Sequence, residues 1–248
     1  MQKIDIERSK MKNKKKFLRT SISALVVVAT VLISVVATIK YKEDYDEEKR
    51  FNYIRENVEK SSEEKILYNL KKKNKDIVGY IEIPNTTISY PVLQTTDEPD
   101  FYLNHDINRN YSFYGTPYLS AYCNLEKSDN LIIYGHNING TKMFGELTKY
   151  RDENFFNKHR NVCFTTDRKQ KYKIFSVISV NKKAFPYWKF VMAQDKLDYD
   201  EFINKVKKYS FYDVGITPQY GDKIITLSTC DNDRGNDYRF VIFGIKYK

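Results

Sequence analysis

The chain has 248 residues, 15% of them aromatic, and this much ring surface excludes a disordered chain and suits a β-rich domain. The net charge of +10 is concentrated in residues 1–20, which carry eight basic groups against two acidic ones. The rest of the chain is only mildly basic, so we expect no nucleic-acid partner. Three cysteines without a Cys-x-x-Cys spacing exclude a disulfide scaffold and a metal-ligand cluster.

Residues 21–39 form an uncharged apolar segment, SISALVVVATVLISVVATI, that is long enough to cross a bilayer as a helix. The basic tail, residues 1–20, precedes it, and acidic residues follow from Glu43 onward. By the positive-inside rule, the N-terminus is then cytoplasmic and the domain is extracellular, anchored as a single-pass membrane protein. The alternative is a cleaved signal peptide, although the segment is longer than a usual signal core and lacks a clear Ala-x-Ala site.

Residues 40–76 are predicted to form a helical extension between the anchor and the domain. Apolar residues recur there at helical spacing in two runs, Phe51, Ile54 and Val58, then Ile66, Leu67 and Leu70. Ser61-Ser62-Glu-Glu is typical of a helix start. We therefore expect two helices that pack on the domain, with a solvated stalk as the alternative.

From Ile77 the sequence changes to short segments rich in β-branched and aromatic residues, separated by Asn, Asp, Gly and Pro. Eight strands are predicted, at 77–82, 87–93, 115–120, 130–135, 161–166, 172–180, 223–229 and 239–247. Helical patterns interrupt them at 143–158 and 198–209. Eight strands with little helix between them predict a mainly β fold, a closed or nearly closed barrel over residues 77–248.

The cysteine most suited to chemistry is Cys230, which ends the predicted strand KIITLSTC. Strand alternation places Cys230 on the same face as Thr226 and Ser228, the more polar face, at the entrance to the loop DNDRGND. A thiol there can meet solvent and substrate. Cys123 and Cys163 lie beside aromatic residues within strand patterns and are interpreted as small buried side chains.

A nucleophilic thiolate needs a nearby base or cation, and His136, which follows a strand and Gly135, could supply it. Acyl transfer also needs positive charge where the oxyanion develops. Arg239 begins the last strand, and a hairpin returning from Cys230 would bring it beside the sulfur. Arg234, in the intervening loop, is the alternative. Of the other two histidines, His159 is interpreted as a surface residue and the role of His105 stays open.

These residues resemble the sortases. The resemblance rests on TLSTC (226–230), an Arg at the head of the last strand, YGH (134–136) and the N-terminal anchor. Class B is indicated by the helical extension, by the helix at 198–209 between two late strands, and by HNINGTKMFGEL (136–147) and YLNHD (102–106). The resemblance covers roughly residues 75–248 and implies an eight-stranded sortase barrel from a Gram-positive bacterium.

The resemblance also implies a reaction. Cys230 would attack the Thr carbonyl of an NPxTN-like sorting motif near the C-terminus of a surface protein, and an amine of the peptidoglycan precursor would resolve the thioester. His136 would be the general acid, and Arg239 would steady the carbonyl and the oxyanion. The peptide groove would be lined by Asn104, Ser228, Thr229 and Tyr187. Neither a cofactor nor a metal is implied, and Asp231 and Asp233 would act on the site only electrostatically.

Two other classes of protein remain open from the residues alone. A hydrolytic cysteine peptidase would use the same Cys–His chemistry, although papain-like enzymes place the cysteine first and at a helix start, whereas here His136 precedes Cys230 and the cysteine ends a strand. An anchored binding domain with inert cysteines is the second alternative.

Overall fold

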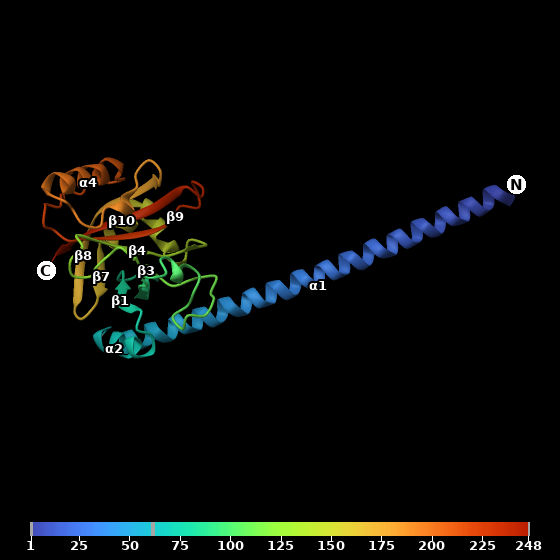
Figure 1. The fold of residues 1–248 in the computed structure, drawn as a ribbon, viewed down its shortest axis with the longest axis horizontal. Helices are drawn as coiled ribbons and strands as arrows, with labels where there is room; N and C mark the ends of the chain where they lie inside the picture. Colours follow the sequence, from blue (N-terminus) through green and yellow to red (C-terminus); the bar gives the residue numbers. More distant parts are fainter. Residues whose placement is uncertain (1, 61–62, 248) are drawn as a thin grey trace. The chain divides into compact units, whose positions relative to one another are not determined.

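The protein is described here by a computed structural model that covers residues 2–60 and 63–247. It divides into two compact units, Met1–Asn52 and Tyr53–Lys248. The long helix α1 (Gln2–Lys60) contains the predicted anchor, and the stretch Thr20–Glu56 is the single helical segment, among the residues described, that is long and apolar enough to cross a membrane (Figure 1). The first of the two expected extension helices is therefore not separate, because α1 continues without a break to Lys60.

The second extension helix is α2 (Glu63–Lys73), which lies against strand β1 (Ile77–Glu82). Its apolar side chains Ile66, Leu67 and Leu70 are buried, so α2 packs on the domain and is not a solvated stalk. The predicted start at Ser61 and Ser62 lies outside the described residues.

The second unit is built around a closed eight-stranded barrel in the order β1-β2-β3-β4-β9-β10-β8-β7. The other strands are β2 (Ser89–Leu93), β3 (Tyr118–Leu119), β4 (Asn130–Tyr134), β7 (Asn161–Thr165), β8 (Lys169–Asn181), β9 (Ile224–Cys230) and β10 (Tyr238–Tyr247). The β2–β3 and β4–β9 pairs are parallel and the remaining pairs are antiparallel. All eight predicted strands and the barrel are confirmed, with changes at the strand ends.

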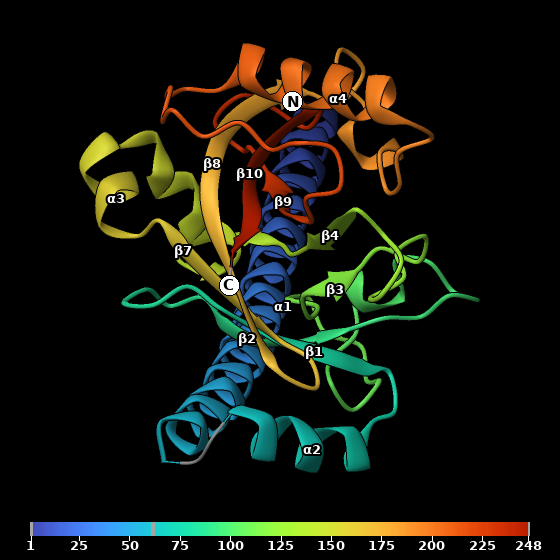
Figure 2. The same ribbon diagram turned by 90° about the vertical axis from the view of Figure 1, so that its left-hand side faces the viewer.

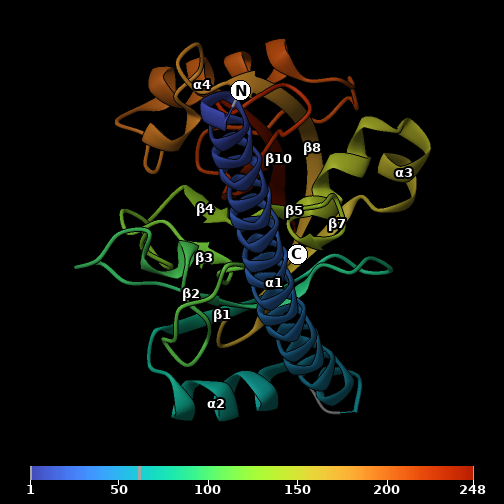
Figure 3. The same cartoon turned by 90° about the vertical axis from the view of Figure 1, so that its right-hand side faces the viewer.

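Helix α4 (Lys196–Tyr209) confirms the helix predicted at 198–209. It packs against β8 and lies on the opposite side of the barrel from α2 (Figures 2 and 3). The helical patch predicted at 143–158 is confirmed from residue 145 onward, as two short helical segments and not one continuous helix. That stretch contains the end of a small hairpin, β5 (Asn137–Ile138) with β6 (Lys142–Met143), then η2 (Gly145–Arg151) and α3 (Glu153–Lys158). The two helical segments are separated at Asp152, whose backbone is extended. The Asp152 side chain caps α3 by accepting a hydrogen bond from the Phe155 N–H.

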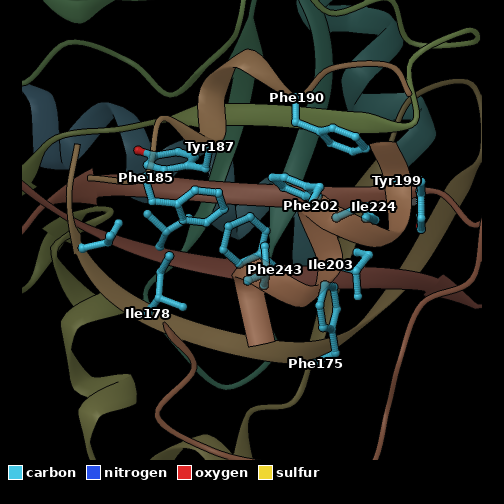
Figure 4. Close-up of a cluster of buried hydrophobic side chains, with 13 residues drawn as sticks. Phe175, Ile178, Phe185, Tyr187, Phe190, Tyr199, Phe202, Ile203, Ile224 and Phe243 are labelled. Carbon is cyan, nitrogen blue, oxygen red and sulfur yellow. The ribbon is translucent and has the colours of Figure 1, made fainter. Parts of the chain in front are cut away.

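An aromatic cluster fills the space between α4 and strands β8 and β10 (Figure 4). Phe190 stacks on Phe202 of α4 with ring centroids 3.9 Å apart, and Tyr187 meets Phe243 of β10 edge-on at 6.3 Å. Tyr187 belongs to the short helix η3 (Tyr187–Lys189), so this packing fixes the loop between β8 and α4 onto the barrel. That loop forms one wall of the site described next.

Candidate active site

Three strands bring Cys230, His136 and Arg239 to one end of the barrel. In the β9–β10 hairpin, Arg239 pairs directly with Cys230. Strand β4 runs parallel to β9 with Tyr134 level with Ser228, so His136, two residues further on, lies level with Cys230. All three side chains line one pocket of about 480 Å³.

Aromatic rings form part of the wall of this pocket. Tyr118 and Tyr134 lie side by side with ring centroids 5.4 Å apart, and Tyr187 and Trp188 of η3 also line the pocket. Burial raises the pKa of Tyr187 to about 12, so its hydroxyl stays neutral and can donate a hydrogen bond. An apolar wall with few polar groups suits a peptide held in an extended conformation.

His136 is held by a main-chain carbonyl. Its Nε2 lies 2.7 Å from the carbonyl oxygen of Leu103, in the short helix η1 (Phe101–Leu103). A carbonyl can only accept, so Nε2 carries a hydrogen and Nδ1 is the nitrogen at which a neutral ring gains a proton. Gly135 is required beside it, because a Cβ there would lie 2.7 Å from the ring of Phe144.

The Leu103 carbonyl is itself fixed by its neighbours. The hydroxyl of Tyr102 donates to the Asp76 carboxylate at 2.6 Å, and the Arg109 guanidinium binds the same oxygen. Gly115, with φ +57°, packs so tightly against η1 that no side chain fits between them. Helix η1 therefore presents a rigid acceptor to the histidine.

Of the two candidate arginines, Arg239 reaches the pocket and Arg234 does not. Arg239 Nη1 donates to the carbonyls of Asn236 at 2.8 Å and Tyr238 at 2.9 Å, and its other nitrogens have no protein partner among the residues described. Arg234 instead lies over the ring of Tyr238 and donates to Ser179 at 3.3 Å. The free guanidinium edge beside Cys230 belongs to Arg239.

Asp231, the residue after the cysteine, is turned away from the pocket. Its carboxylate is fully buried and accepts two hydrogen bonds of 2.5 Å from Arg151 Nη2 and a third from the Ser179 hydroxyl. Asp233 lies 3.6 Å from Arg151 and is exposed. Neither carboxylate lines the pocket, so neither orients His136 as the acidic member of a triad would.

The four residues predicted for the peptide groove lie in different places. Ser228, Thr229 and Tyr187 line the pocket, with the Tyr187 and Ser228 hydroxyls 2.6 Å apart. The Thr229 hydroxyl is buried and has no partner within the described part of the chain. Asn104 does not line the pocket; its side chain is exposed, directly after Leu103, which does.

The remaining cysteines and histidines lie outside the pocket. Cys123 and Cys163 are both buried, as predicted, although Cys123 lies in the loop before β4 and not in a strand. Burial raises the pKa of Cys123 to about 11, which makes it a poor nucleophile. His105 stacks on Phe101 at 3.8 Å, and His159 is half-buried at the end of α3, so it is not the surface residue that was predicted.

Two contacts of the site were not predicted. One is the Leu103 carbonyl beside His136, which could not be predicted because every residue has a main-chain carbonyl. The other is a hydrogen bond of 2.9 Å from the Asn137 side chain to the Cys230 carbonyl. The only sequence signal for Asn137 is its position directly after the histidine.

A closed mixed barrel that presents a cysteine, a histidine and an arginine at one pocket defines a cysteine acyltransferase of the sortase type. The chain belongs to the sortase family: the family model described as a sortase domain matches residues 81–246. It is 34% identical over 183 residues to Sortase B of Listeria monocytogenes, covering 72% of both chains.

Solved structures agree with this assignment. The structure of Clostridium perfringens sortase B matches with a TM-score of 0.68 and 32% identity, covering 73% of this chain and 99% of that one. Sortase B from Bacillus anthracis in complex with AAEK1 gives a TM-score of 0.75 and 28% identity, covering 84% and 99%. The expected class B membership and cysteine transpeptidase activity are confirmed.

Proposed function

We propose that this sortase cleaves an NPxTN-like motif near the C-terminus of surface proteins and joins the new end to an amine of the peptidoglycan precursor. The observation that carries the proposal is the pairing of Cys230 with Arg239 across β9 and β10, with His136 two residues beyond the end of β4, the parallel neighbour of β9. A sulfur nucleophile, a proton donor and an oxyanion partner then face one aromatic groove.

The first step forms the acyl-enzyme. The Cys230 thiolate, paired with the His136 imidazolium, attacks the Thr carbonyl carbon, and a C–S bond forms while negative charge moves to the carbonyl oxygen. The Arg239 guanidinium stabilises that oxyanion. The N–H of Asp231 is already used by the Tyr238 carbonyl at 3.2 Å, so the arginine carries more of this role. The C–N bond then breaks as His136 protonates the leaving amine.

The second step transfers the acyl group. An amine of the peptidoglycan precursor gives a proton to His136 and attacks the thioester carbonyl, again stabilised by Arg239. The C–S bond breaks, an amide forms, and the thiolate–imidazolium pair of Cys230 and His136 is restored. No cofactor is required, since the bond energy of the first amide is kept in the thioester.

Recognition of the motif is assigned to the groove. The Tyr187 and Ser228 hydroxyls bond each other at 2.6 Å, which leaves one hydroxyl hydrogen and the remaining lone pairs to a peptide. The buried Thr229 hydroxyl, unpartnered in the described residues, would gain a partner from bound substrate. Asn104, at the rim beside Leu103, is suited to contact the same peptide from the opposite wall.

The proposed topology follows from charge and hydropathy. Residues 1–20 form a cytoplasmic tail, 21–39 the membrane span, 40–76 a helical extension, and 77–248 the extracellular catalytic barrel. The support is the basic tail on one side of the apolar segment and the acidic residues on the other. Substrates would then be secreted surface proteins held near the same membrane.

Intact-mass spectrometry of the full-length protein in detergent tests this function. NPxTN-type and LPxTG-type peptides are added with and without an amine acceptor, to the native protein, to Cys230→Ala and to Cys123→Ala. We expect a thioester adduct on the native protein and on Cys123→Ala, its absence from Cys230→Ala, and its conversion to an amide by the amine. Release by water alone, with no amide even at high amine, would instead favour the hydrolytic peptidase.

A further inference from the structure

We propose that Asn137 is a positioning residue that keeps Cys230 and His136 in register during acyl transfer. The inference rests on the proposed roles of that pair and concerns a side chain that takes no part in the chemistry. It is drawn from the way the two strands that carry them stop pairing at the edge of the pocket.

The main-chain ladder between β4 and β9 reaches its end just before the catalytic residues. The Gly135 N–H donates to the Ser228 carbonyl at 3.1 Å. In a parallel pair the bonds recur every second residue, so the next bond would run from the N–H of residue 137 to the Cys230 carbonyl. That carbonyl accepts instead from the side chain, Asn137 Nδ2, at 2.9 Å.

The side chain substitutes for the main chain because the backbone has already turned. Asn137 pairs with Met143 in the β5–β6 hairpin, whereas the β4–β9 register ends at Tyr134 and Ser228. Its Oδ1 accepts from the Gly140 N–H at 3.0 Å, and this bond fixes which end of the amide faces Cys230. A Cβ on Gly145 would lie 2.9 Å from Oδ1, so the amide has little room to move.

A reciprocal bond links the same two segments. Asn232, two residues after the nucleophile, donates from Nδ2 to the Asn137 carbonyl at 3.4 Å. His136 thus lies between two residues that are each hydrogen-bonded to β9. Gly135 bonds to the Ser228 carbonyl and Asn137 bonds to the Cys230 carbonyl. The imidazole and the sulfur are carried by backbones that cannot slide past each other.

Two substitutions distinguish a positioning role of Asn137 from a role in the hairpin turn alone or an effect of charge. Asn137→Asp keeps the acceptor for Gly140 but removes the donor to Cys230, whereas Asn137→Ala removes both. Thr148→Ala is the matched control, because the Thr148 hydroxyl donates to the Gly145 carbonyl at 2.8 Å in the same segment without reaching β9. Each variant is made in the full-length protein, and its melting temperature is recorded first.

We expect kcat to fall about 10- to 100-fold in both Asn137 variants with KM changed less than about twofold, since misplacement by about 1 Å can cost that much. The pH midpoint of Cys230 alkylation by iodoacetamide should also move upward in both, because the thiolate is held less closely to the imidazolium. Thr148→Ala should keep the native kcat and the native alkylation profile.

Three results would overturn the proposal. If Asn137→Ala keeps the native kcat, the bond to Cys230 is dispensable. If only Asn137→Ala is impaired, the residue acts solely through the hairpin turn. If only Asn137→Asp is impaired and salt restores it, the effect is charge alone. If the native protein forms no acyl-enzyme, the proposed function fails, while the alkylation profiles still report the geometry of the pair.

Discussion

Replacing Gly115 with alanine would test whether a rigid η1 matters to His136. A Cβ on Gly115 would lie 2.3 Å from the Leu103 carbonyl oxygen and 2.6 Å from that of Tyr102. Contacts of a Cβ below 3.0 Å are essentially never seen, so η1 would have to move by about 0.7 Å. The atom nearest the new methyl group is the one that accepts the hydrogen bond from His136.

The displacement sets the expected magnitude. The bond from His136 Nε2 to Leu103 is 2.7 Å long, and a shift of that size lengthens it beyond a good hydrogen bond or carries the ring along. Either change moves the His136 imidazole, the proposed proton donor, relative to Cys230, for which we expect a loss of about 10- to 100-fold in kcat. The left-handed backbone adds about 1–2 kcal/mol of destabilisation that is unrelated to catalysis.

Gly215→Ala separates strain from displacement. Gly215 also has a left-handed backbone, φ +67°, but no atom lies within 4 Å of where its Cβ would stand. Peptide cleavage rates and melting temperatures of both variants are compared with the native protein. Both variants should melt lower, and only Gly115→Ala should lose activity. A folded Gly115→Ala with the kcat of Gly215→Ala would refute the role of the Leu103 carbonyl.

Three further predictions follow from burial and charge. Burial raises the pKa of Cys123 to about 11, so about one Cys123 thiol in a thousand is ionised at pH 8. Iodoacetamide should therefore label Cys230 first, and the rate of Cys123 labelling should rise about tenfold per pH unit up to pH 11. Equal labelling rates for the two cysteines at pH 8 would contradict this. Arg151→Ala leaves the buried Asp231 carboxylate without its ion pair and should cost about 2–4 kcal/mol in urea unfolding, a loss that a surface pair would not show. Tyr187→Phe strands the buried Ser228 hydroxyl and should cost about 1–3 kcal/mol, so an unchanged melting temperature would disprove that bond.

Much of the barrel could be predicted because its signals are local. Each strand is a short β-branched and aromatic run bounded by turn residues, and the run from 223 to 229 ends at Cys230 as predicted. The pairing of Arg239 with Cys230 could also be anticipated, since a short hairpin leaves few registers for two adjacent strands. Spacing alone therefore placed Arg239 near Cys230 but left Arg234 as the alternative, and the roles of these residues came only from the resemblance.

The hairpin that carries Asn137 could not be predicted in this way. Its strands are two residues long, too short for any alternation, and apolar residues further on gave a helical period across 143–158. Its shape depends on left-handed backbones at Asn139, Gly140 and Met143, and on the ring of Phe144 packing against Gly135. These features depend on tertiary contacts, and local sequence patterns do not indicate which segments pack together.

The position of Asp231 bears on how the cysteine can be activated. A carboxylate one residue from a nucleophilic thiol disfavours the thiolate if its charge reaches the sulfur. Here strand alternation turns Asp231 to the opposite side from Cys230, and Arg151 and Ser179 neutralise and solvate it there. The charged residues that line the pocket with Cys230 include Arg239, Lys182, which forms an ion pair with Asp237 at 3.1 Å, and Asp100, which accepts a hydrogen bond from Tyr118 at 2.8 Å. The fold thus turns the nearest carboxylate away from the Cys230 sulfur and leaves Arg239 beside it, so the proposed mechanism needs no third carboxylate at the site.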